Sequence, residues 1–193
     1  MKTHAAIVRS WLEYRSLSNR EWRKDYFSWA TGGYVATHRL KARDNTQLAG
    51  IKAEVSTCQL LADIGKKVLR LPENIADKID IIKIDGKPYR DLLKFKPNEN
   101  KPRGYPDAYF DGQTWDFKTS TYQNEDSIRQ AIKNGRKAEN MVFVSFNEPI
   151  SNLAAVKTAI GREYGSRVKD DTWKELPDIL YLYEYQLIKI WCK

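Results

Sequence analysis

The stretch YPDAYFDGQTWDFK, residues 105–118, decides how the second half of this chain folds. Asp111-Gly112 lies between two runs rich in aromatic residues, and an Asp-Gly pair in that position is typical of a two-residue type I′ turn. The segment therefore predicts a β-hairpin with strands at 107–110 and 113–119.

The turn also fixes the register of the hairpin, and this register brings acidic side chains together. Asp107 is predicted to lie opposite Asp116, and the alternation of side chains along a strand puts Lys118 on the same face. The other face is apolar and carries Ala108, Phe110, Trp115 and Phe117. Two carboxylates about 5 Å apart across a strand pair repel each other unless a cation lies between them.

A divalent ion is the simplest reason for such a pair. Mg²⁺ and Mn²⁺ prefer carboxylate oxygens and keep bound waters. A nearby lysine then orients the attacking water or neutralises charge that develops on a phosphate. The alternative is an ordinary surface salt bridge between Asp107 and Lys118.

A third carboxylate is predicted from residues 49–64, which are expected to form a helix ended by Gly65. At helical spacing, Glu54 falls inside the apolar stripe between Cys58 and Leu61 rather than on the polar side. A glutamate that faces the core needs a cation or a donor to meet it. The alternative is a residue at the edge of the stripe whose long side chain reaches water.

The order of the expected elements predicts an α/β fold with a mixed central sheet flanked by helices. We expect an N-terminal helical extension over residues 1–30 and one further domain over 31–193. Further helices are expected at 4–15, 21–29, 124–138 and 151–164. Further strands are expected at 34–39, 67–71, 141–146, 179–185 and 187–191, with a turn at Asp85-Gly86 between short extended runs at 81–84 and 88–89.

The composition and charge of the chain indicate which binding partners to expect. The chain has 193 residues and a net charge of +8, which favours a polyanion such as nucleic acid. The first residues lack the apolar run of a signal peptide, and no stretch is long enough to span a membrane. We therefore expect a cytoplasmic protein, or one delivered to a target cell as part of a larger chain. Cys58 and Cys192 have no disulfide or zinc spacing, and no Gly-rich loop indicates a nucleotide cofactor.

The pattern Glu54, then Pro106-Asp107, then Asp116-Phe117-Lys118 resembles the E…PD…(D/E)xK motif of the restriction-endonuclease-like superfamily. Together with Leu71-Pro72-Glu73 and Gly32-Gly33-Tyr34-Val35…His38, it is similar to the nuclease domains of contact-dependent growth inhibition (CdiA-type) toxins and of related phage-associated proteins. The resemblance implies a restriction-endonuclease-like sheet and cleavage of tRNA or DNA with Mg²⁺ or Mn²⁺. It assigns catalysis to Glu54, Asp107, Asp116 and Lys118 and the metal to the three acids, and it leaves room for an immunity protein as a partner.

Four cations at the outward side of the helix after the hairpin are candidates for contacts with phosphates: Arg129, Lys133, Arg136 and Lys137. A plain solvated helix face is the alternative. Two other functions stay open: a metal-independent ribonuclease that uses His38 as general acid or base, and a nucleic-acid-binding module without catalysis.

Overall fold

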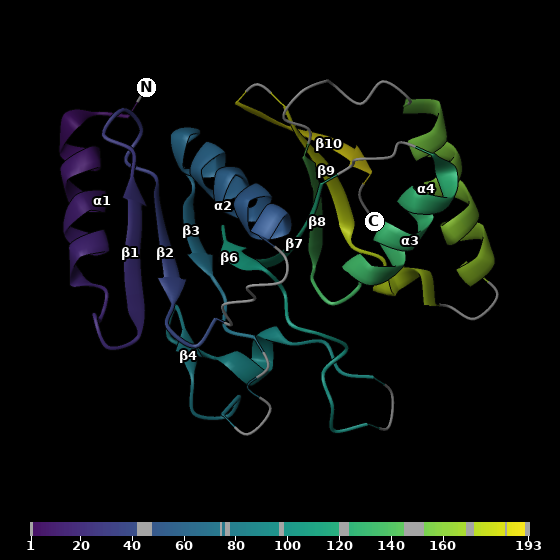
Figure 1. The fold of residues 1–193 in the computed structure, drawn as a ribbon, viewed down its shortest axis with the longest axis horizontal. Helices are drawn as coiled ribbons and strands as arrows, with labels where there is room; N and C mark the ends of the chain where they lie inside the picture. The colour runs from purple at the N-terminus through teal and green to yellow at the C-terminus, as the bar shows by residue number, and fades with distance from the viewer. Residues whose placement is uncertain are drawn as a thin grey trace. The chain divides into compact units, whose positions relative to one another are not determined.

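The computed structural model describes residues 2–41, 48–73, 75, 78–96, 99–119, 124–144, 153–168, 172–183 and 185–191. The chain divides into two compact units, Met1–Thr114 and Trp115–Lys193. In Figure 1 the first unit runs from purple to teal and the second from green to yellow.

The first unit contains a mixed sheet in the order β1-β2-β3-β6. Its strands are β1 (Trp22–Phe27), β2 (Tyr34–His38), β3 (Lys67–Arg70) and β6 (Ala108–Phe110). β1 and β2 are antiparallel, β2 and β3 are parallel, and β3 and β6 are antiparallel. Helix α1 (His4–Ser16) packs against β1, and α2 (Leu48–Asp63) packs across β1, β2 and β3.

The end of α2 is closely packed against the start of β2. Gly65, at a φ of 89°, reverses the chain after the helix. Gly33 lies so near this turn that a Cβ atom on it would come within 2.0 Å of the carbonyl oxygen of Ala62. The glycine at position 33 therefore permits the close approach that fixes α2, and with it Glu54, on the sheet.

The helix expected at 21–29 is wrong, because this segment forms strand β1. Its pairing with β2 shifts register between Lys24 and Tyr26, which is a β-bulge. The extra residue interrupts the period-two alternation, and the burial of the strand accordingly shows no regular alternation that the sequence pattern could reveal.

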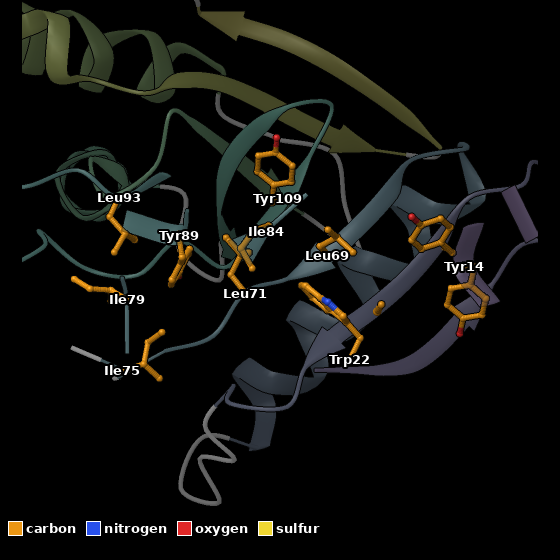
Figure 2. Packing of buried hydrophobic residues seen from close by; sticks show 12 residues of the cluster. Tyr14, Trp22, Leu69, Leu71, Ile75, Ile79, Ile84, Tyr89, Leu93 and Tyr109 are labelled. Atoms are coloured by element: carbon orange, nitrogen blue, oxygen red, sulfur yellow. The ribbon is translucent and has the colours of Figure 1, made fainter. Parts of the chain in front are cut away.

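Between β3 and β6 the chain makes a long excursion, residues 71–107, that leaves the sheet and returns to the same place. Its two ends meet where the amide of Leu71 donates to the carbonyl of Asp107 at 3.0 Å. The excursion contains β4 (Lys83–Ile84), β5 (Lys87–Pro88) and the 3-10 helix η2 (Tyr89–Leu92). Its buried Ile75, Ile79, Ile84, Tyr89 and Leu93 join the core of the first unit, as Figure 2 shows.

The second unit contains a mixed sheet in the order β7-β8-β9-β10. Its strands are β7 (Gln113–Thr119), whose first two residues belong to the first unit, β8 (Asn140–Val144), β9 (Asp178–Tyr183) and β10 (Gln186–Trp191). β7, β8 and β9 are parallel neighbours, and β10 is antiparallel to β9. Helices α3 (Glu125–Gly135) and α4 (Leu153–Val168) pack on each other, and the 3-10 helix η3 (Thr172–Glu175) contacts α4 (Figure 1).

These mixed sheets with flanking helices confirm the predicted α/β class. The predicted turn is also present, since Asp111 and Gly112 both have the positive φ that a type I′ turn needs. Asp107 belongs to the first unit and Asp116 to the second, so their predicted pairing stays a prediction, as does a domain boundary at residue 30. No helix among the described residues has the length and apolar character needed to cross a membrane.

Candidate metal centre and buried carboxylates

Three carboxylates converge in the first unit: Glu54, Glu73 and Asp107 each place one oxygen within 4.8 Å of the others. The topology explains why they meet. β3 and β6 are antiparallel, so the residues that follow β3 and those that precede β6 lie at the same end of the strand pair. Glu73 and Asp107 occupy these two positions, and α2 supplies Glu54. All three residues are half-buried.

Glu54 faces the sheet and is held there by two cations. The Nε of Arg70, on β3, donates to Glu54 Oε1 at 3.0 Å, and the Nζ of Lys41 lies 3.1 Å from the same oxygen. The side chain of Glu54 is 16% exposed. The position within the apolar stripe thus reflects an inward carboxylate with partners, not a side chain that reaches water.

Lys41 lies against the acidic cluster with a side chain that is only 6% exposed. Besides Glu54 it contacts the carboxylate of Glu73 through a short ion pair. Burial by itself would lower the pKa of Lys41, but the carboxylates of Glu54, Glu73 and Asp107 outweigh burial and raise it. The ammonium group is therefore positively charged at neutral pH.

Arg70 links the cluster to the interior of the sheet. Its NH1 donates to the hydroxyl of Thr37 at 3.1 Å, and that hydroxyl donates in turn to the carboxylate of Asp25. Burial opposes the charged form of Arg70, yet the neighbouring Glu54 carboxylate raises the pKa of the guanidinium. Lys41 thus pairs with both Glu54 and Glu73, and Arg70 pairs with Glu54.

The donor set fits a hard divalent cation. Carboxylate oxygens are the ligands that Mg²⁺ and Mn²⁺ prefer, and three separate chain segments supply them here. Glu54 and Asp107 are two of the three expected ligands. Glu73 was missed, because its place depends on the pairing of β3 with β6, which the sequence does not reveal.

Asp116, the third expected ligand, is a fully buried residue of β7 in the second unit. Its Oδ2 lies 2.8 Å from the Nζ of Lys118, and its Oδ1 lies 2.8 Å from the Nζ of Lys137. The Asp-x-Lys motif thus forms a contact within one strand. Lys137, expected at a nucleic-acid surface, is instead directed at this buried carboxylate.

The other three predicted phosphate-binding cations also contact acids. The NH1 of Arg136 lies 3.5 Å from Oε2 of Glu175 on η3. Arg129 and Lys133 both approach Glu163, a fully buried glutamate of α4, at 3.5 and 3.6 Å. Arg136 and Lys137 follow the end of α3 at Gly135, and the four cations contact three carboxylates in total, those of Glu163, Glu175 and Asp116.

His38 is buried at the end of β2, where its ring packs edge-on against Trp22. Its Nδ1 accepts a hydrogen bond from the amide of Leu40 at 3.2 Å. Burial lowers the pKa of His38, and the more distant Glu21 opposes this only in part. These contacts favour a neutral, structural imidazole, although they do not test the ribonuclease alternative.

Cys58 lies on the inner face of α2 as a buried free thiol, as expected for a reduced cysteine. Burial raises the pKa of this thiol, so it stays protonated at neutral pH. Cys192 and the predicted N-cap Ser151 lie outside the described residues.

No protein-family model, curated protein or solved structure matches this chain. The resemblance to restriction-endonuclease-like nucleases therefore stays a prediction.

Proposed function

We propose that this chain is a nuclease that hydrolyses phosphodiester bonds of tRNA or DNA with Mg²⁺ or Mn²⁺. The observation that carries the proposal is the convergence of Glu54, Glu73 and Asp107 within 4.8 Å. It is supported by the Asp116-x-Lys118 contact and by the net charge of +8, which favours a polyanionic substrate.

In this proposal the residues of the site have different roles. Glu54, Glu73 and Asp107 hold the ion, and the hairpin register predicted from the sequence adds Asp116 to them. When bound, the ion would lower the pKa of a water and polarise the phosphate. Lys118 orients the attacking water or stabilises the negative charge that develops on the phosphate. Arg70 and Lys41 position the Glu54 and Glu73 carboxylates.

The test is cleavage of total tRNA and of supercoiled plasmid by the purified chain, with Mg²⁺, with Mn²⁺ and with EDTA. We expect cleavage of at least one substrate with either ion and none with EDTA. Cleavage that survives EDTA would favour the metal-independent ribonuclease and His38. Binding without cleavage under every condition would favour the non-catalytic module, and both results would overturn the proposal.

A matched pair of variants assigns the activity to the cluster. Asp107→Asn removes a negative charge from the site with little change of shape, and we expect it to abolish detectable cleavage. Asp91→Asn makes the same change at an exposed position of η2 in the same unit and should retain full activity. Equal activity of the two variants would exclude the cluster as the catalytic centre.

A further inference from the structure

The most unusual charged group outside the candidate metal centre is Glu163, on α4 of the second unit. It is 0% exposed, and three cations surround its carboxylate. The Nε of Arg167 donates to Oε2 at 3.2 Å, and its NH2 donates to the same oxygen at 3.3 Å. Arg129 and Lys133 of α3 approach the other oxygen, Oε1, at 3.5 and 3.6 Å.

The two oxygens of Glu163 are satisfied to different extents. Oε2 accepts hydrogen bonds from Arg167, but Oε1 and the Nε of Arg129 are buried with no hydrogen-bond partner among the described residues. Arg129 and Lys133 are thus attracted to the carboxylate without forming hydrogen bonds to it. Their donors are oriented by Glu163 and retain capacity for another acceptor.

The charge of the cluster around Glu163 favours a negatively charged acceptor. Among the residues that the structure describes, three cations face this one carboxylate, a surplus of two positive charges. The side chains of Arg129 and Lys133 are 30% and 41% exposed, so their outer groups reach solvent. A single buried carboxylate needs one cation to neutralise it, and a cluster built only to brace α3 against α4 has no need of three.

We propose that Arg129, Lys133 and Arg167 form a phosphate-binding site that Glu163 holds in place, and that its ligand is the backbone of a nucleic acid. Glu163 fixes the directions of the long cationic side chains before the ligand arrives, which reduces the entropy lost on binding. The proposal adds Arg167 to the predicted contacts and removes Arg136 and Lys137, which are directed at Glu175 and Asp116.

This inference takes its choice of ligand from the proposed function, so its test separates binding from cleavage. A labelled duplex DNA and a labelled single-stranded RNA are titrated with the protein in EDTA over a series of salt concentrations. Lys133→Gln should lower the slope of log affinity against log salt by about 0.9 for the duplex and about 0.7 for the single strand, the loss of one phosphate contact.

Lys157→Gln is the matched control, because Lys157 is an exposed lysine of α4 outside the cluster. It should leave the salt slope unchanged, and Lys133→Arg should restore the slope that Lys133→Gln loses. If Lys133→Gln and Lys157→Gln have the same slope as the parent protein, the cluster is only a brace between helices and the inference is wrong. Inorganic phosphate that competes as well as the nucleic acid at equal phosphate concentration would also overturn it, because the site would then bind a free anion.

The same titration distinguishes the two proposals. A slope that falls in Lys133→Gln, in a protein that cleaves neither tRNA nor plasmid with Mn²⁺, supports the phosphate site and contradicts the nuclease. Cleavage that depends on Mn²⁺ with an unchanged slope supports the nuclease and contradicts the phosphate site.

Discussion

Glu54 on α2 and Glu163 on α4 are both glutamates held against cationic side chains, but their other charged neighbours differ. Glu54 belongs to a cluster of three carboxylates with two direct cationic partners, Lys41 and Arg70. Glu163 is a single carboxylate with three. Burial and ion pairing are common to both sites, so neither property identifies what a site binds.

The balance of acidic and basic side chains distinguishes the two sites. An excess of carboxylates attracts a cation, and an excess of arginine and lysine attracts an anion, each more strongly in a partly buried site than in water. On this basis we propose a metal site for the first unit and a phosphate-binding site for the second. Both ligands of a metal-dependent nuclease then have a site of the matching charge.

The largest effect is expected when the same substitution is made at both glutamates. Glu54→Gln should reduce the metal-dependent cleavage rate by about 10²- to 10³-fold, as for the loss of one group that stabilises charge at a reacting centre. Glu163→Gln should leave the rate unchanged once the substrate saturates the enzyme. Single-turnover cleavage at saturating enzyme gives both rates.

Because Glu54→Gln also removes the carboxylate that pairs with Arg70 and leaves Lys41 paired with Glu73 alone, the free energy of unfolding of each variant must be measured beside its rate. Glu73→Gln is the complementary variant, since the side chain of Glu73 is more exposed than that of Glu54 and pairs with Lys41, whereas Arg70 pairs with Glu54. A cleavage rate that falls equally for Glu54→Gln and Glu163→Gln would show that the two sites do not differ in role.

The next effect concerns stability. Mn²⁺ should stabilise the folded chain through the acidic cluster, by about 2.7 kcal/mol at a concentration one hundred times its dissociation constant. Denaturant titrations with and without Mn²⁺ measure this difference. Asp107→Asn should reduce the stabilisation strongly, whereas Glu163→Gln should retain it. Stabilisation that is the same in parent protein and Asp107→Asn would place the ion elsewhere.

The sequence predicted what depends on local pattern. Asp111-Gly112 specified its turn, and the stripe on α2 indicated that Glu54 faces inward, since both signals lie within a few consecutive residues. The failures have non-local causes. Pairing of β3 with β6 brings Glu73 to the site, and an excursion with its own buried residues separates Glu54 from Asp107 in sequence without separating them in space.

The four cations between Arg129 and Lys137 illustrate the same point, that a local sequence pattern does not predict partners on other elements. Their spacing predicted a common helix, but α3 ends at Gly135 and includes only Arg129 and Lys133. Their acidic partners come from α4, η3 and β7, which no helical pattern can predict. A pattern of charges on one helix therefore identifies candidates for binding. The acids on neighbouring elements decide which of those candidates keep a surplus of charge.

A smaller effect is expected where glycines allow close packing in the two units. Gly33→Ala would put a Cβ atom 2.0 Å from the backbone oxygen of Ala62, which cannot move without displacing α2. We expect a loss of about 1–3 kcal/mol in the free energy of unfolding, and weaker Mn²⁺ binding because Glu54 moves with the helix. Gly135→Ala meets the flexible side chain of Met141 at 2.6 Å and should cost less. Urea denaturation of both variants tests this order.

The smallest effect is a pH dependence of stability from His38. Burial lowers the pKa of this imidazole in the folded protein, so below pH 6.5 the unfolded chain binds more protons than the folded one. The contribution of His38 is therefore complete above the unfolded pKa and is lost as the pH falls through the lowered folded pKa. Protonation would also put a hydrogen on Nδ1, which accepts from the Leu40 amide.

His38→Gln should thus flatten the decline of the free energy of unfolding below pH 6.5, measured by urea denaturation at a series of pH values. The site around Glu54 should keep its Mn²⁺ affinity at pH 7, because His38 contacts Leu40 and Trp22. A His38→Gln variant that folds normally but loses all cleavage would instead assign a catalytic role to the imidazole. That result would move the reacting centre away from the three carboxylates and remove the contrast between the two glutamates.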